Sequence, residues 1–91
     1  MLETEVSVTN ALGLHARAAA RLVKLASSFS STVSLRRDDS GVEADAKSIL
    51  SLLYIAASQG VKLKLTADGD DEREALEQIA AMFAAGFGEE R

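Results

Sequence analysis

The strongest constraint on the fold of this chain is the order in which two kinds of hydrophobic spacing follow each other. Apolar residues at every second position indicate strands, and those three and four positions apart indicate helices. Strand spacing occurs at residues 2–8, 32–37, 42–44 and 61–65. Helical spacing occurs at residues 16–27, at residues 47–57 and between Asp70 and Gly86. The sequence therefore predicts the order β-α-β-β-α-β-α and an α+β fold.

The length of 91 residues predicts a single domain, residues 1–91, with one hydrophobic core. Apolar residues make up 47% of the chain and aromatic residues only 4%, so the core must consist of aliphatic side chains. Local signals mark several element ends. Gly13 suits a backbone with positive φ, Asp70 can cap the last helix, and Gly86 can end it.

Composition excludes several classes of protein. The formal net charge of −4 argues against a nucleic-acid binder, and the lack of cysteine argues against disulfides and thiolate metal sites. The first residues lack the basic and apolar regions of a signal peptide, and no apolar stretch approaches a membrane span. We therefore expect a cytoplasmic protein that binds neither nucleic acid nor membrane and needs no metal or cofactor.

His15 is the only histidine, and it lies where a glycine-containing loop meets the first predicted helix. The free N–H groups of a helix start favour an anion and disfavour a positively charged ring. A neutral imidazole is nucleophilic, and once phosphorylated it would hold its charge near those groups and near Arg17. The alternative is that His15 is merely a polar residue at a helix start. No Ser, Cys or carboxylate lies within four positions of it, so no local catalytic dyad is visible.

The motif Asn10-Ala-Leu-Gly-Leu-His-Ala-Arg17 resembles the active-site motif of the histidine-containing phosphocarrier (HPr) family of the bacterial phosphotransferase system. The resemblance extends to the predicted element order, to residues 46–50 (Ala-Lys-Ser-Ile-Leu), to Gln59-Gly60 and to the acidic turn at residues 68–71. It implies a four-stranded antiparallel sheet with three helices packed on one face, an open-faced sandwich.

The resemblance also implies roles for individual residues and partners. His15 would accept a phosphoryl group on Nδ1 from phosphorylated Enzyme I, which is itself charged by phosphoenolpyruvate, and would donate it to enzyme IIA domains. Arg17 would be the phosphate partner. The protein would be a monomeric carrier serving sugar transport or regulation, not an enzyme. Ala18 departs from the family pattern, which has proline after the arginine, and we expect this to alter rate or partner preference rather than the chemistry.

Ser48 has two compatible interpretations. A serine before a helix commonly caps it. In many relatives the serine of this Lys-Ser motif is phosphorylated by an HPr kinase/phosphorylase, so the resemblance implies possible regulation here. A phosphate at a helix start would not unfold the helix, but it would add negative charge to a docking surface.

Two surfaces are candidates for partner docking. The predicted helix 47–57 is too apolar to bury every face, and with Leu52 and Ile55 directed inward, Ile49 and Leu53 would face outward. Looser packing and self-association are the alternatives. Arg17, Arg21 and Lys24 recur along one helix face and are the only charged residues between Asn10 and Ser31. This basic stripe is either a solvated face or a surface that steers acidic partners.

Two other functions are alternatives to phosphoryl transfer. A β-α-β-β-α-β order also occurs in ferredoxin-like modules, including RNA-binding ones, but those need aromatic residues on the sheet, and the predicted strands carry none. An autonomous enzyme would need a second catalytic group, and the sequence offers none that is visible.

Overall fold

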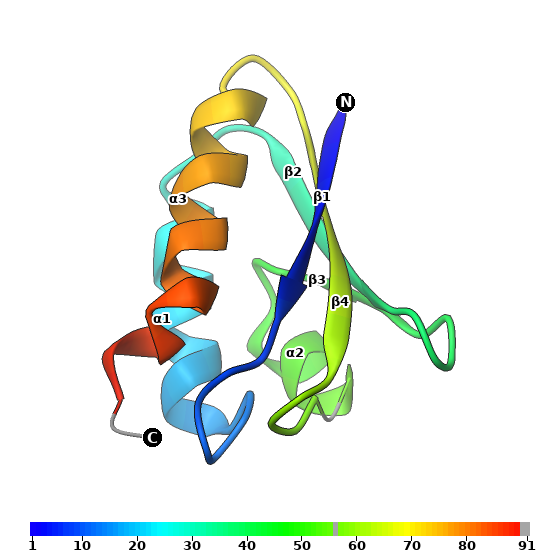
Figure 1. Cartoon of the computed structure of the whole chain (residues 1–91). Coiled ribbons are helices and arrows are strands. Elements are labelled where there is room, and N and C mark those ends of the chain that lie inside the picture. The colour runs from blue at the N-terminus through cyan, green and yellow to red at the C-terminus, as the bar shows by residue number, and fades with distance from the viewer. Residues whose placement is uncertain (56, 90–91) are drawn as a thin grey trace.

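A computed structural model of the chain describes residues 1–55 and 57–89. Its elements, in order, are β1 (Leu2–Ser7), α1 (Ala16–Ser27), β2 (Thr32–Arg37), β3 (Glu43–Asp45), α2 (Ile49–Ile55), β4 (Lys62–Asp68), α3 (Glu72–Ala84) and a 3₁₀ turn, η1 (Gly86–Gly88) (Figure 1). The predicted element order is confirmed, and η1 is an addition that the sequence analysis did not contain.

The four strands form one sheet in the order β1-β4-β2-β3, and every neighbouring pair is antiparallel. The helices lie on one face of this sheet, as Figure 1 shows. The predicted α+β open-faced sandwich is therefore confirmed. β4 lies between β1 and β2, so the last strand in the sequence joins the first two.

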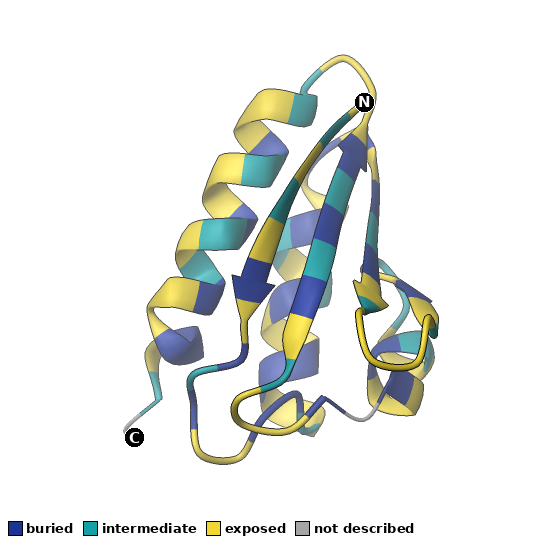
Figure 2. Cartoon of the chain, turned by 45° about the vertical axis from the view of Figure 1, so that its right-hand side comes forward, coloured by how far each residue is buried: buried dark blue, intermediate teal, exposed yellow. Residues whose placement is uncertain are grey.

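Alternation along the strands directs one set of side chains into the core. Leu63, Leu65 and Ala67 of β4 are buried, and the residues between them are partly exposed (Figure 2). Leu65 lies opposite Leu35 of β2, so the buried set continues across the sheet.

The three helices complete the core with one face each. α1 contributes Ala18, Ala19, Leu22 and Ala26, α2 contributes Leu52 and Ile55, and α3 contributes Ala75, Ile79 and Phe83. Burial of a side chain the size of Leu22 stabilises the fold by about 1.5–3 kcal/mol. The core is aliphatic, apart from the phenylalanines, as the composition predicted.

The second helix is shorter than predicted, because a turn occupies its expected start. It spans Ile49–Ile55 rather than residues 47–57. The backbone N–H of Ser48 donates to the carbonyl of Asp45 at 3.0 Å, and that of Lys47 donates to the Asp45 side chain at 2.9 Å. These bonds close a turn at residues 45–48, so the helix begins after this turn. β3 likewise begins one residue later than predicted, at Glu43.

The prediction that Asp70 caps the last helix is wrong. Asp71 holds the N-cap position of α3 and makes no capping bond itself. Its carboxylate instead accepts hydrogen bonds from the backbone N–H groups of Ser30 and Ser31, both at 2.9 Å, and from the Ser31 hydroxyl. β4 also runs on to Asp68, past its predicted end at residue 65, because Ala67 continues the buried alternation.

Candidate functional site

His15 lies at the N-cap position of α1, as the sequence analysis placed it. Its backbone is extended, with φ −77° and ψ 179°, and its carbonyl accepts the hydrogen bond from the N–H of Ala19 at 2.8 Å. The imidazole makes no capping bond to the helix, and its side chain is 25% exposed. The first turn of α1 carries no acidic residue, so its N–H groups face no competing charge within the helix.

The loop before His15 is held by Asn10 and Gly13. Asn10 is fully buried, and its Nδ2 donates to the Gly13 carbonyl at 2.8 Å. Gly13 has the predicted positive φ, 66°, and a Cβ there would lie 2.5 Å from the carbonyl oxygen of Ala57. The N–H of Leu14 donates to that same oxygen at 2.9 Å. The loop is thus hydrogen-bonded to the segment that follows α2. This contact fixes the course of the backbone at His15.

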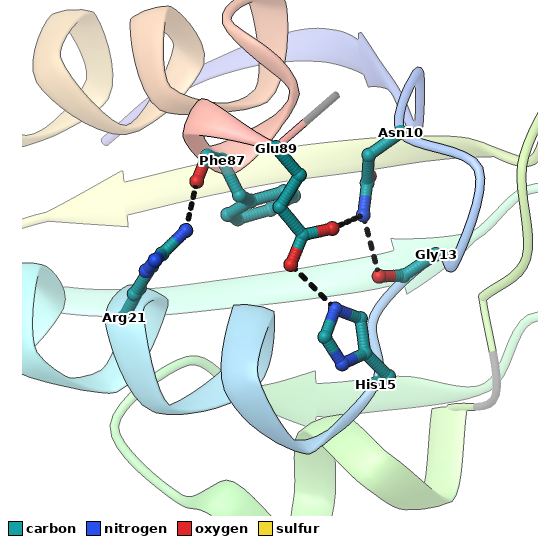
Figure 3. Close-up of polar contacts among 6 residues, drawn as sticks. All are labelled: Asn10, Gly13, His15, Arg21, Phe87 and Glu89. Atoms are coloured by element: carbon teal, nitrogen blue, oxygen red, sulfur yellow. Dashed lines mark hydrogen bonds and ion pairs between the residues drawn. The ribbon is translucent and has the colours of Figure 1, made fainter. Parts of the chain in front are cut away.

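The segment that follows α3, through Glu89, folds back over this site. Gly86, Phe87 and Gly88 have φ values of 62°, 57° and 74°, and these turn the backbone back after α3. Phe87 is buried against Phe83, with ring centroids 4.9 Å apart in an edge-to-face arrangement. Its carbonyl accepts a hydrogen bond from Nη1 of Arg21 (Figure 3). The turn therefore anchors the C-terminal segment against α1.

Glu89 reaches His15 from this turn. Its Oε2 lies 2.6 Å from His15 Nε2, and its Oε1 accepts a hydrogen bond from Asn10 Nδ2 at 2.9 Å (Figure 3). The Glu89 side chain is only 9% exposed. The Asn10 hydrogen bond, aided by His15 and by the charge of Arg17, holds the pKa of Glu89 below its usual value. The carboxylate is therefore ionised at neutral pH.

Glu89 is the site residue that the sequence analysis missed. It lies 74 positions from His15, so no local spacing connects the two. The signal present in the sequence is the Gly-Phe-Gly run at residues 86–88, which predicts a turn rather than a loose end.

The three basic residues of the predicted stripe have different environments. Arg17 is exposed in the first turn of α1, and its charge contributes to the lowered pKa of Glu89. Arg21 donates a hydrogen bond from one N–H group to the Phe87 carbonyl. Lys24 is exposed in the last turn of the helix. Arg17 thus belongs to the surroundings of His15, while Arg21 also has a structural bond.

Ser48 directly precedes α2 and has the contacts of a capping residue. Its Oγ accepts a hydrogen bond from the N–H of Ser51 at 3.3 Å, and its carbonyl accepts one from Leu52 at 3.1 Å. The residue is partly exposed. The capping interpretation is therefore confirmed, and the regulatory one stays a prediction.

The outer face of α2 is apolar, as predicted, and extends beyond the two predicted residues. Leu52 and Ile55 are buried, and Ile49 and Leu53 are each 39% exposed. Leu50 and Tyr54 are more exposed still, at 77% and 79%. Leu12, on the loop before His15, adds another exposed apolar side chain. The helix thus has one face in the core and a wide apolar face outside it.

Neither a metal centre nor a membrane span is found in the part of the chain that the structure describes. Residues 1–55 and 57–89 contain no cluster of three His, Cys, Asp or Glu side chains placed to hold a metal ion. No helix in these ranges is long and apolar enough to cross a bilayer.

Comparison with known proteins now identifies the family. The model of a family described as "PTS HPr component phosphorylation site" matches residues 2–85. The chain belongs to the HPr family. It is 44% identical over 90 residues to the phosphocarrier protein HPr of Xylella fastidiosa, covering 99% of each chain. It is also 44% identical over 85 residues to the phosphocarrier protein NPr of Proteus mirabilis, covering 93% of each.

Solved structures agree with this assignment to the HPr family. The crystal structure of HPr from Thermoanaerobacter tengcongensis superposes with a TM-score of 0.92 at 41% identity, covering 100% of both chains. The phosphocarrier protein HPr of Bacillus anthracis superposes with a TM-score of 0.82 at 35% identity, covering 88% of this chain and 93% of that one. The protein is therefore a phosphocarrier of the phosphotransferase system with the HPr fold.

Proposed function

We propose that His15 is the phosphoryl carrier of this protein. It takes the group on Nδ1 from phosphorylated Enzyme I, which is charged by phosphoenolpyruvate, and passes it to an enzyme IIA domain. The observation that carries the proposal is the position of the imidazole at the start of α1, free of any capping bond to that helix. The protein itself is then a substrate of Enzyme I and not an enzyme.

The surroundings of His15 suit an anion. The N–H groups at the start of α1 have no partner within the helix, and the helix dipole adds partial positive charge. Arg17, exposed in the same turn, supplies a guanidinium that can bind a phosphoryl oxygen. Ala18 is fully buried in the first turn of α1, so its departure from the family proline changes the helix start rather than the exposed surface.

Labelling tests the proposal directly. The purified chain is incubated with Enzyme I and ³²P-labelled phosphoenolpyruvate, and the label is expected to be acid-labile and to disappear in His15→Ala. Because His15 is the sole histidine, no second phosphohistidine can obscure the result. An unlabelled wild-type chain, or equal labelling of the variant, would contradict the proposal.

We also propose that partners dock on the outer face of α2 and on the start of α1. Ile49 and Leu53, with Leu50 and Tyr54, offer apolar contact beside the site, and Arg17, Arg21 and Lys24 offer positive charge. Interfaces of this composition combine an apolar centre with charges that steer the encounter. Chemical-shift mapping with Enzyme I tests this, and shifts confined to the open face of the sheet would argue against it.

A regulatory phosphoserine at Ser48 is a separate proposal. Phosphate there would meet the start of α2 and would add negative charge next to Ile49. An HPr kinase/phosphorylase is expected to label the wild-type chain and Ser51→Ala but not Ser48→Ala. Label retained in Ser48→Ala would remove this form of regulation without affecting the carrier role.

A further inference from the structure

The contact between Glu89 and His15 does more than hold the end of the chain. Glu89 Oε2 lies 2.6 Å from Nε2, the ring nitrogen opposite to the one proposed to carry phosphate. Figure 3 shows Nε2 facing Glu89 and the second ring nitrogen on the side turned away from it. The carboxylate therefore contacts the imidazole without covering Nδ1.

An ionised carboxylate only accepts hydrogen bonds, so this contact requires a proton on Nε2. In a neutral imidazole that proton leaves Nδ1 with a free lone pair. Two features keep Glu89 ionised and in place. Asn10 Nδ2 donates to Oε1 at 2.9 Å, and this bond is the main cause of the lowered pKa of Glu89, while the charge of Arg17 lowers that pKa further.

We propose that Glu89 is a positioning residue for phosphoryl transfer, because it fixes His15 in the tautomer that has its proton on Nε2 and its nucleophilic lone pair on Nδ1. This inference rests on the proposed carrier function of His15. The relation matches that of a buried carboxylate to the histidine of a catalytic triad, where the carboxylate orients the ring and sets its tautomer.

The transfer step is balanced without a further proton acceptor. The Nδ1 lone pair forms a bond to phosphorus while the bond from phosphorus to the donor atom breaks, and that electron pair leaves with the donor. His15 needs to release no proton, because Nδ1 carried none. The ring becomes positively charged in the product, and the carboxylate then lies beside a protonated Nε2.

The same contact favours the onward step. When the acceptor takes the phosphoryl group, the bonding pair returns to Nδ1, and a ring that kept its proton on Nε2 leaves as neutral imidazole. A ring that had lost this proton would have to leave as imidazolate, a much poorer leaving group. Glu89 thus supports both acceptance and donation by stabilising the N–H on the far side of the ring.

The alternative is that Glu89 is only a structural clasp. It joins the turn after α3 to the Asn10 loop, and a clasp would alter stability without altering the ring. A second alternative is that the C-terminal segment obstructs partners, in which case its release would speed transfer. The tautomer of His15 and the rate of transfer together distinguish these two alternatives from a positioning role for Glu89.

The experiment compares wild type, Glu89→Gln and the control Glu77→Gln, an exposed carboxylate on α3. ¹⁵N shifts of the neutral imidazole give the tautomer ratio, and rapid quench with phosphorylated Enzyme I gives the rate of transfer. We expect Glu89→Gln to raise the share of the tautomer protonated on Nδ1 and to slow transfer about 3- to 10-fold, which is less than the roughly 10- to 100-fold lost when a metal-bound histidine loses its hydrogen-bonded carboxylate. Glu77→Gln should change neither.

An unchanged tautomer ratio in a folded Glu89→Gln variant would overturn the inference, as would an unchanged or faster transfer rate. Thermal unfolding and amide spectra establish that the variant is folded, and Glu89→Asp, which keeps the charge, should recover part of the tautomer ratio. Failure of the carrier proposal is distinguishable, because the wild-type chain would then take no label while its tautomer could still depend on Glu89.

Discussion

At the scale of single residues, Asn10 is the point on which the site depends most. One amide nitrogen donates to Gly13, which shapes the loop, and to Glu89, which reaches the imidazole. The side chain is fully buried, and its Oδ1 has no hydrogen-bond partner in residues 1–55 and 57–89. Asn10 thus arranges the site through the two hydrogen bonds that its amide nitrogen donates.

Replacing Asn10 by alanine should lower both stability and order at the site. The buried Gly13 carbonyl loses its donor, which costs about 1–3 kcal/mol, and Glu89 loses the bond that holds its carboxylate in place. Urea unfolding measures the change, and ¹⁵N shifts of His15 should move in the same direction as in Glu89→Gln. Asn10→Asp keeps the shape of the side chain and is the matched control. It should destabilise the fold more at pH 7 than at pH 4, because it places a second carboxylate beside that of Glu89. Wild-type stability in Asn10→Ala would contradict this account.

At the scale of elements, α2 has two apolar faces with different roles. Leu52 and Ile55 are buried, while Leu50 and Tyr54 are mostly exposed. A helix of seven residues has little stability of its own, so it depends on its buried face and on the turn before it. The outer face is then available for contact with other proteins.

Truncation of α2 side chains should separate stability from docking. Leu52→Ala is expected to lower the free energy of unfolding by about 2–5 kcal/mol, as buried leucines do, and Leu50→Ala by about 0.5 kcal/mol or less. The two changes remove the same atoms, so each is the other's control. Chemical denaturation gives stability, and the apparent affinity for Enzyme I gives docking. A large loss of stability in Leu50→Ala would show that the outer face is packed.

The contact between the start of α3 and the loop that joins α1 to β2 should be sensitive to acid through Asp71. Hydrogen bonds from the Ser31 side chain and the Ser30 backbone lower the pKa of Asp71 from 3.8 to about 2. A lowered folded-state pKa contributes stability above the unfolded value, and that stability is lost as the pH falls from 3.8 toward 2. The difference in Tm between wild type and Asp71→Asn should thus be constant from pH 7 to 5 and shrink below pH 4. A constant difference down to pH 2.5 would contradict this.

How far the sequence predicts each element depends on how local its determinants are. α1 and β2 have the predicted limits, because the hydrophobic spacing and the flanking serines and turns define them within the segment itself. α2 begins later than predicted because of a turn closed by Asp45, and Asp71 replaces Asp70 because its partners lie on another segment. The position of His15 at a helix start was local and was predicted correctly. Its contact with Glu89 depends on tertiary folding and was not.

At the scale of the whole molecule, charge is unevenly distributed along the chain. Arg17, Arg21 and Lys24 are the only charged residues between Asn10 and Ser31, and eight acidic residues follow from Asp68 onward. The net charge is −4, so the basic helix is a local exception on an acidic protein. We expect this basic face of α1 to attract an acidic partner.

Transfer from phosphorylated Enzyme I should therefore depend on ionic strength. At low donor concentration the second-order rate constant is expected to fall several-fold between about 20 mM and 300 mM salt, because the screening length shortens from about 20 Å to about 6 Å. Lys24→Gln should weaken this dependence. Arg73→Gln, which removes the same charge in the first turn of α3, should leave it unchanged. A salt-independent rate would show that the basic stripe does not steer the encounter.

The place of β4 in the middle of the sheet has a consequence for how the chain folds during synthesis. β1 and β2 pair with β4 and not with each other, and β4 ends at Asp68. The ribosome must therefore synthesise the chain through Asp68 before β1 can pair along its whole length with β4. Until then both strands present unpaired edges, and the loop to be closed between β1 and β4 is long, which slows folding. Before that point, only α1 and the β2–β3 hairpin can give the nascent chain local structure. The His15 site forms last, after the turn at residues 86–88 has left the ribosome.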